Sequence, residues 1–115
     1  MTGTLHIGAG WLKGATVGVR AYRPQMSPAK PHGPAIVVLP GFGRTVADLA
    51  PWLAQICVRY PVTLLELPGQ GGSEAPSSVT LASLAAEIRT AMAQLQGPAL
   101  LVGESLGGLV ALKIA

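Results

Sequence analysis

The sequence predicts an α/β fold in which helices flank a mainly parallel sheet. Three short runs rich in valine, leucine and isoleucine, at residues 35–39, 62–67 and 99–102, indicate strands that are buried on both faces. Segments with apolar residues at helical spacing separate these runs. Because strands that alternate with helices form βαβ units, we expect the three strands to be parallel.

Length and composition indicate one domain. The chain has 115 residues, which is enough for one buried core and too few for two. Of these residues 50% are hydrophobic and 11% are charged, a composition typical of largely buried segments. We therefore assign residues 1–115 to a single domain. Residues 1–34 are less regular: 15–21 indicate one strand of a hairpin, and 23–33, with three prolines, indicate a loop.

Start signals and periodicity define three helices. The first should begin after Thr45, whose hydroxyl can form a capping box with Asp48, and should run to about residue 58. The second has apolar residues at helical spacing from 81 to 95, which places Glu87 and Arg89 on other faces. The third begins at Ser105, and no stop signal follows it.

Several classes of protein are disfavoured. No apolar stretch reaches the roughly 18 residues of a membrane span, and residues 1–10 do not have the pattern of a signal peptide, so we expect a cytoplasmic protein without membrane contact. The basic residues behind the net charge of +3 are scattered, which disfavours nucleic-acid binding. The single cysteine, Cys57, cannot form an internal disulfide and should be a small buried residue.

The pentapeptide GESLG at residues 103–107 carries the chemistry. It matches the pattern G-x-S-x-G and lies directly between a predicted buried strand and a predicted helix. A tight turn there would expose the Ser105 hydroxyl at the end of the sheet, and a side chain at Gly103 or Gly107 would collide with the neighbouring strand or helix. The positive start of the helix would favour an oxyanion beside Ser105.

Two further segments stand at the ends of predicted strands: LPGFG at 39–43 and ELPGQGGS at 66–73. Together with the pentapeptide, they resemble the α/β-hydrolase superfamily from about residue 35 onward. The resemblance implies an α/β-hydrolase fold, with the third strand beside the first and the second on the far side. It also implies that Ser105 is the nucleophile of a nucleophile elbow with the glycines Gly103 and Gly107, and that the NH groups of Phe42 and Leu106 form the oxyanion hole.

The chain departs from the family pattern at two positions. Pro40 stands where the family has histidine, which leaves the anchoring of the following loop unexplained, and Glu66 stands where the family has aspartate. We expect Glu66 to brace its loop by accepting backbone NH groups, and we expect a structural role for Glu104, the residue before the nucleophile.

The family orders its triad as serine, then an acid, then histidine, and the ten residues after Ser105 contain neither of the last two. His32 precedes the first predicted strand and should lie roughly 15 to 20 Å from Ser105, too far to act as its base. His6 is expected to be a surface or structural residue. The triad acid and histidine are thus missing from this chain.

The expected function is that of a serine hydrolase (an esterase, thioesterase or related acyl hydrolase), represented by its N-terminal half, truncated after the elbow and inactive as given. It would take a small ester-like substrate, with no metal or organic cofactor implied. The alternative is a non-catalytic truncated chain or pseudo-enzyme that retains the fold. In either case the last predicted strand would have an open edge through which the chain could self-associate.

A nucleotide site is the remaining alternative, and the glycines disfavour it. Gly41-Phe42-Gly43 lacks the third glycine of a dinucleotide-binding turn. Residues 103–108 have the glycine spacing of a phosphate-binding loop, but Leu109 and Val110 replace the lysine and the hydroxyl residue that would hold phosphate and Mg²⁺.

Overall fold

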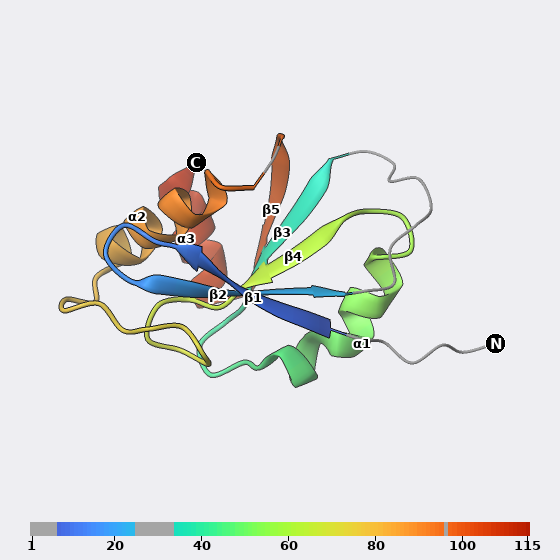
Figure 1. The fold of residues 1–115 in the computed structure, drawn as a ribbon, viewed down its shortest axis with the longest axis horizontal. Helices are drawn as coiled ribbons and strands as arrows, with labels where there is room; N and C mark the ends of the chain where they lie inside the picture. The colour runs from blue at the N-terminus through green and yellow to red at the C-terminus, as the bar shows by residue number, and fades with distance from the viewer. Residues whose placement is uncertain (1–6, 25–33, 96) are drawn as a thin grey trace.

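One mixed sheet with helices on both faces organises the part of the chain that the structure describes (Figure 1). The structure is a computed structural model and describes residues 7–24, 34–95 and 97–115. Its elements, in chain order, are β1 (Ile7–Lys13), β2 (Gly18–Pro24), β3 (Ala35–Leu39), α1 (Val46–Ile56), β4 (Val62–Leu65), α2 (Leu81–Met92), β5 (Ala99–Gly103) and α3 (Leu106–Ile114).

The strand order is β1-β2-β4-β3-β5. β3 is parallel to β4 on one side and to β5 on the other, whereas β2 is antiparallel to both β1 and β4. The predicted parallel strands and their order are therefore confirmed. Three strand boundaries differ: β4 ends at Leu65 rather than at residue 67, β5 ends at Gly103 rather than at residue 102, and the hairpin strand runs from Gly18 to Pro24 rather than over 15–21.

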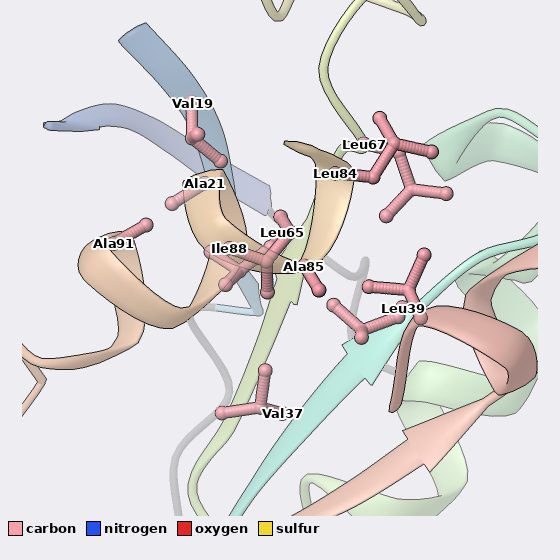
Figure 2. Packing of buried hydrophobic residues seen from close by; sticks show 11 residues of the cluster. Val19, Ala21, Val37, Leu39, Leu65, Leu67, Leu84, Ala85, Ile88 and Ala91 are labelled. Atoms are coloured by element: carbon pink, nitrogen blue, oxygen red, sulfur yellow. The ribbon is translucent and has the colours of Figure 1, made fainter. Parts of the chain in front are cut away.

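The sheet has a hydrophobic core on each face because alternate residues of a strand point to opposite sides. Val37 and Leu39 of β3 belong to the core under α2 and α3, which includes Ile88 and Val110 and is shown in part in Figure 2. Ile36 and Val38 belong to the other core, whose remaining members are Leu49, Leu53, Cys57, Val62 and Leu64. Cys57 is buried as predicted, and burial raises the pKa of its thiol.

Hydrogen-bonding caps begin two of the helices. Thr45 accepts the NH of Asp48 and donates its own NH to the Asp48 carboxylate, which confirms the predicted capping box. Thr80 and Ser83 form a second capping box at α2, which the prediction did not include. None of the helices in the described ranges has the length and apolar character needed to cross a membrane.

Glu87 is buried, although its position off the apolar stripe of α2 is typical of a surface residue. Its side chain is 3% exposed, and its carboxylate accepts the NH of Thr16 at 2.8 Å, the Thr16 hydroxyl and the NH of Val17. Burial pushes the pKa of Glu87 upward, but these hydrogen bonds outweigh it and hold the pKa below its usual range. The donors come from the β1–β2 turn, which directly precedes the first residue of β2, Gly18.

Candidate active site

Ser105 lies at the tight turn between β5 and α3. It is the residue before the first turn of α3, and its backbone has φ 52° and ψ −114°, a positive φ found at no other non-glycine position in the described ranges. Such a conformation costs on the order of 1–3 kcal/mol and persists only where the surrounding structure enforces it. The turn is fastened on both sides: the NH of Glu104 donates to the Leu39 carbonyl at 3.0 Å, and that of Gly107 to the Glu104 carbonyl at 2.8 Å.

Two glycines allow the turn to pack this closely. A Cβ on Gly103 would lie 2.5 Å from the carbonyl oxygen of Gly107, and one on Gly107 would lie 1.9 Å from that of Leu39. Both distances are far inside van der Waals contact with backbone atoms that cannot move aside. Gly108 differs, because a Cβ there would have its closest neighbour at 3.4 Å. The requirement for glycine is therefore a packing requirement at 103 and 107 and not at 108.

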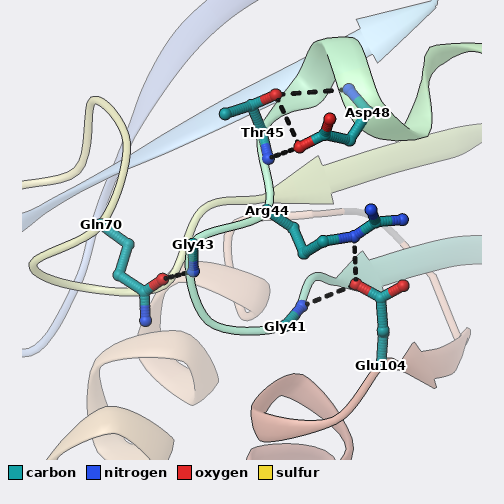
Figure 3. Close-up of polar contacts among 7 residues, drawn as sticks. All are labelled: Gly41, Gly43, Arg44, Thr45, Asp48, Gln70 and Glu104. Atoms are coloured by element: carbon teal, nitrogen blue, oxygen red, sulfur yellow. Dashed lines mark hydrogen bonds and ion pairs between the residues drawn. The ribbon is translucent and has the colours of Figure 1, made fainter.

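The loop that follows β3 lies directly beside Ser105. A Cβ on Gly41 would stand 3.2 Å from the Cβ of Ser105, so the two residues are in contact across the edge of the sheet. Within this loop, the NH of Gly41 donates to Glu104 Oε1 at 3.1 Å and the NH of Gly43 to Gln70 Oε1 at 2.9 Å (Figure 3). The NH of Phe42, between them, has no acceptor among the described residues.

A second NH group adjoins Ser105 on the helix side. Leu106 is the first residue of α3, and the first NH groups of a helix have no partner within the helix and carry its positive end. Phe42 thus follows Gly41 in the loop that contacts the serine, and Leu106 follows the serine at the start of α3. The sequence predicts these two NH groups as the donors to an oxyanion, and that role stays a prediction.

Glu104 connects the two halves of the site. Its Oε1 accepts the Gly41 NH and pairs with Arg44 Nε at 3.0 Å, and these hydrogen bonds hold the pKa of its carboxyl below the usual range. The expected structural role of Glu104 is therefore observed, and it explains how the loop is anchored when Pro40 replaces a histidine. Gln70 and Arg44 take part as well, and no local sequence signal marked them, because their partners come from other segments.

Glu66 braces the neighbouring loop, as predicted. Its buried carboxylate accepts the NH of Gly72 at 2.8 Å, and its carbonyl accepts the Ser73 hydroxyl at 2.7 Å. A Cβ on Gly71 would lie 1.8 Å from Glu66 Oε2, and Gly71 also has φ 55°, so the loop closes tightly over this carboxylate. This loop carries Gln70, and residues 42–45 and 69–71 together line a pocket of about 260 Å³.

Other chemistry finds little support at this edge of the sheet. In the described ranges, no three side chains among His, Cys, Asp and Glu are grouped to hold a metal ion. The NH groups of Gly41 and Gly43 already have side-chain acceptors, so they are not free to cradle a phosphate. The predictions for His6 and His32 fall on residues outside those that the structure describes.

The sequence matches a known protein family and several curated proteins. The family model described as alpha/beta hydrolase fold matches residues 34–115. A pimeloyl-(acyl-carrier protein) methyl ester esterase from Xanthomonas oryzae is 39% identical over 85 residues, and the match covers 73% of this chain and 32% of that protein. A protein of the same name from Xylella fastidiosa is 35% identical over 85 residues, with the same coverage. The chain thus spans about a third of the length of these curated relatives.

Solved structures show the same fold at lower identity. An epoxide hydrolase from Vigna radiata has a TM-score of 0.79 and 21% identity, and the match covers 94% of this chain and 35% of that one. The 2-hydroxy-6-oxo-6-phenylhexa-2,4-dienoate hydrolase of a Rhodococcus has a TM-score of 0.78 and 23% identity, covering 96% and 42%. The alignment extends over the hairpin as well as over the parallel strands.

Proposed function

This chain belongs to the α/β-hydrolase family, and on that premise we propose that it is the part of a serine hydrolase that carries the nucleophile, Ser105. One observation carries the proposal. Ser105 is held at φ 52° in a turn that nothing but glycine fits at 103 and 107, and it touches the loop that presents the Phe42 NH. A strained serine beside unoccupied NH donors is the arrangement that acyl transfer to a hydroxyl requires.

The reaction would proceed through an acyl-enzyme. A base removes the proton of the Ser105 hydroxyl as its oxygen attacks the ester carbonyl, and the NH groups of Phe42 and Leu106 stabilise the oxyanion that forms. The alkoxide leaves with a proton returned by the same base, and water then hydrolyses the acyl-serine to the free acid. Because no histidine lies in the described ranges, the base belongs to a part of the protein outside them.

Carboxylic esters are the substrate class we propose. The curated relatives are named as methyl ester esterases, and an ester places a carbonyl oxygen in reach of both NH donors without demanding a metal ion. The relatives suggest a methyl ester as the first compound to test.

The test uses the covalent chemistry of a fluorophosphonate. We compare the 115-residue chain with a chimera in which the remainder of the Xanthomonas oryzae relative follows Ala115, and we locate the adduct by mass spectrometry. The short chain should label slowly and hydrolyse a p-nitrophenyl ester feebly, because a serine without a base is a weak nucleophile. The chimera should label once per chain at Ser105 and hydrolyse a methyl ester.

Ser105→Ala is the control for the chimera, and it should remove both labelling and turnover. A folded chimera that labels equally well with Ser105→Ala would overturn the assignment of the nucleophile. The alternative, a non-catalytic truncated chain or pseudo-enzyme that retains the fold, is favoured by the lack of a histidine in the described ranges. It predicts that the 115-residue chain, although folded, neither labels nor hydrolyses at all.

A further inference from the structure

We propose that Glu104 and Gln70 are positioning residues that clamp the loop after β3 from its two ends and thereby aim the Phe42 NH at the oxyanion. The clamp deepens the proposed function, because it assigns two side chains to the preorganisation of the same site. Neither touches the reacting atoms. They act through the NH groups on either side of Phe42 (Figure 3).

The first arm of the clamp is Glu104, which belongs to the turn that carries the nucleophile. Its Oε1 accepts the Gly41 NH at 3.1 Å, and a Cβ on Gly41 would lie 3.2 Å from both this oxygen and the Cβ of Ser105. The loop is thus drawn against the serine by the residue that precedes the serine. Any displacement of the turn would carry the loop with it.

The second arm is Gln70, from the loop after β4. Its Oε1 accepts the Gly43 NH at 2.9 Å, two residues beyond the first attachment. Gly43 has φ 74°, a conformation in which the chain reverses, and the NH of Arg44 closes that reversal by donating to the Gly41 carbonyl at 3.2 Å. The NH groups of Gly41 and Gly43 donate to side-chain oxygens, and that of Arg44 donates to a carbonyl. Among the described contacts of this turn, the Phe42 NH therefore remains available to a ligand.

Burial and charge indicate positioning rather than stabilisation of the fold. Arg44 and Glu104 are 44% and 42% exposed, so water screens their ion pair and it adds little to holding the loop. The hydrogen bond from Gly41 is the directional contact. A loop with glycines at 41 and 43 has many accessible conformations, and fixing one of them in advance is what an oxyanion hole needs.

The charged groups around Glu104 give the clamp a pH dependence. Arg44 and the Gly41 NH favour the carboxylate, whereas Asp48, at the start of α1, opposes it, and the balance lowers the pKa of Glu104. Asp48 is itself engaged with Thr45. The Gly41 attachment should therefore hold at neutral pH and loosen as the pH falls below the ordinary glutamate pKa, whereas the Gly43 attachment, made by an uncharged amide, should not respond.

Amide resonances of the full chain test the clamp without any need for catalysis. We expect the Gly41 NH to shift with the titration of Glu104 in the wild type, and Glu104→Ala to make its hydrogen exchange about tenfold faster, the equivalent of one lost hydrogen bond. Glu104→Gln keeps an acceptor oxygen, so it should restore slow exchange and abolish the titration. Gln70→Ala should speed exchange at Gly43 and leave Gly41 unchanged.

Matched controls separate the clamp from general loosening. Glu74 also accepts a backbone NH, that of Gly18 at 2.6 Å, and Glu74→Ala should leave Gly41, Phe42 and Gly43 unaffected. Both Glu104→Ala and Gln70→Ala should move the Phe42 amide resonance and leave Leu106 in place. Unchanged exchange at Gly41 with Glu104→Ala, or a Phe42 resonance indifferent to both variants, would overturn the proposal. The proposed hydrolysis would be judged separately by the labelling of Ser105.

Discussion

The carboxylate of Glu87 in α2 takes both the NH and the hydroxyl of Thr16, with Oε1 2.8 Å from the Thr16 nitrogen. These two residues join the tip of the β1–β2 hairpin to the middle of a helix 71 residues further along the chain. Gln94, just after the end of α2, makes a second attachment to the hairpin. Its side chain accepts the NH of Lys13, the last residue of β1, and donates to the Lys13 carbonyl. A side chain of α2 and one just after its C-terminal end therefore hold the hairpin in place.

Removing this carboxylate should loosen the hairpin. Glu87→Ala leaves the NH groups of Thr16 and Val17 without acceptors, and we expect the free energy of unfolding to fall by about 1–3 kcal/mol. Urea denaturation followed by circular dichroism measures the change. Thr90→Ala, on an exposed turn of the same helix, is the control and should stay within about 0.5 kcal/mol. Equal stability of the two variants would show that Glu87 is not an anchor.

The same carboxylate should make stability depend on pH. The pKa of Glu87 is lowered in the fold because the hydrogen bonds from Thr16 and Val17 outweigh burial, so its stabilisation is fully present above the pKa of the unfolded state. That contribution should be lost as the pH falls through the folded pKa, that is, below the ordinary glutamate range. Denaturation midpoints measured from neutral to acid pH should decline less steeply in Glu87→Gln. Parallel curves for the two proteins would contradict the assignment.

Adjacent glycines at the start of α3 should respond in opposite ways to alanine. Gly107→Ala puts a Cβ 1.9 Å from the Leu39 carbonyl oxygen and should destabilise the chain by several kcal/mol or prevent folding. Gly108→Ala meets nothing closer than 3.4 Å and should be neutral or stabilise the helix by roughly 0.5–1 kcal/mol. Thermal denaturation of the two variants measures the difference. A comparable loss of stability in both would mean that the turn is not packed as described.

The outer edge of β5 should lead to self-association of the 115-residue chain. β5 ends the sheet order, and Leu100 and Val102 on it are 54% and 36% exposed. An apolar strand with an unpaired edge recruits other chains. Sedimentation should show species larger than a monomer, and Val102→Lys, which adds a charge to the edge, should shift them toward monomer mass. A wild-type chain that sediments as a monomer at all concentrations would contradict this expectation.

Local pattern was enough to predict the parallel strands, the cap at Thr45 and the position of Ser105 between strand and helix. Each depends on contacts within a few residues: a run of β-branched side chains, a hydroxyl three residues from an NH, a serine between two glycines. The glycines at 103 and 107 were predicted on the same ground, and the distances to Gly107 and Leu39 backbone atoms give the reason. The catalytic roles of Ser105, Phe42 and Leu106 stay predictions.

Tertiary structure alone decided the polar attachments. Glu87 has the helical position of a surface residue, and it is buried because NH groups from the hairpin turn reach its carboxylate. Gln70 and Gly43 are 27 residues apart, and Glu104 and Gly41 are 63 apart. A sequence shows which side chains can accept a hydrogen bond, but whether a donor arrives depends on how the sheet brings distant loops together. Burying a polar group is favourable only once that donor is in place.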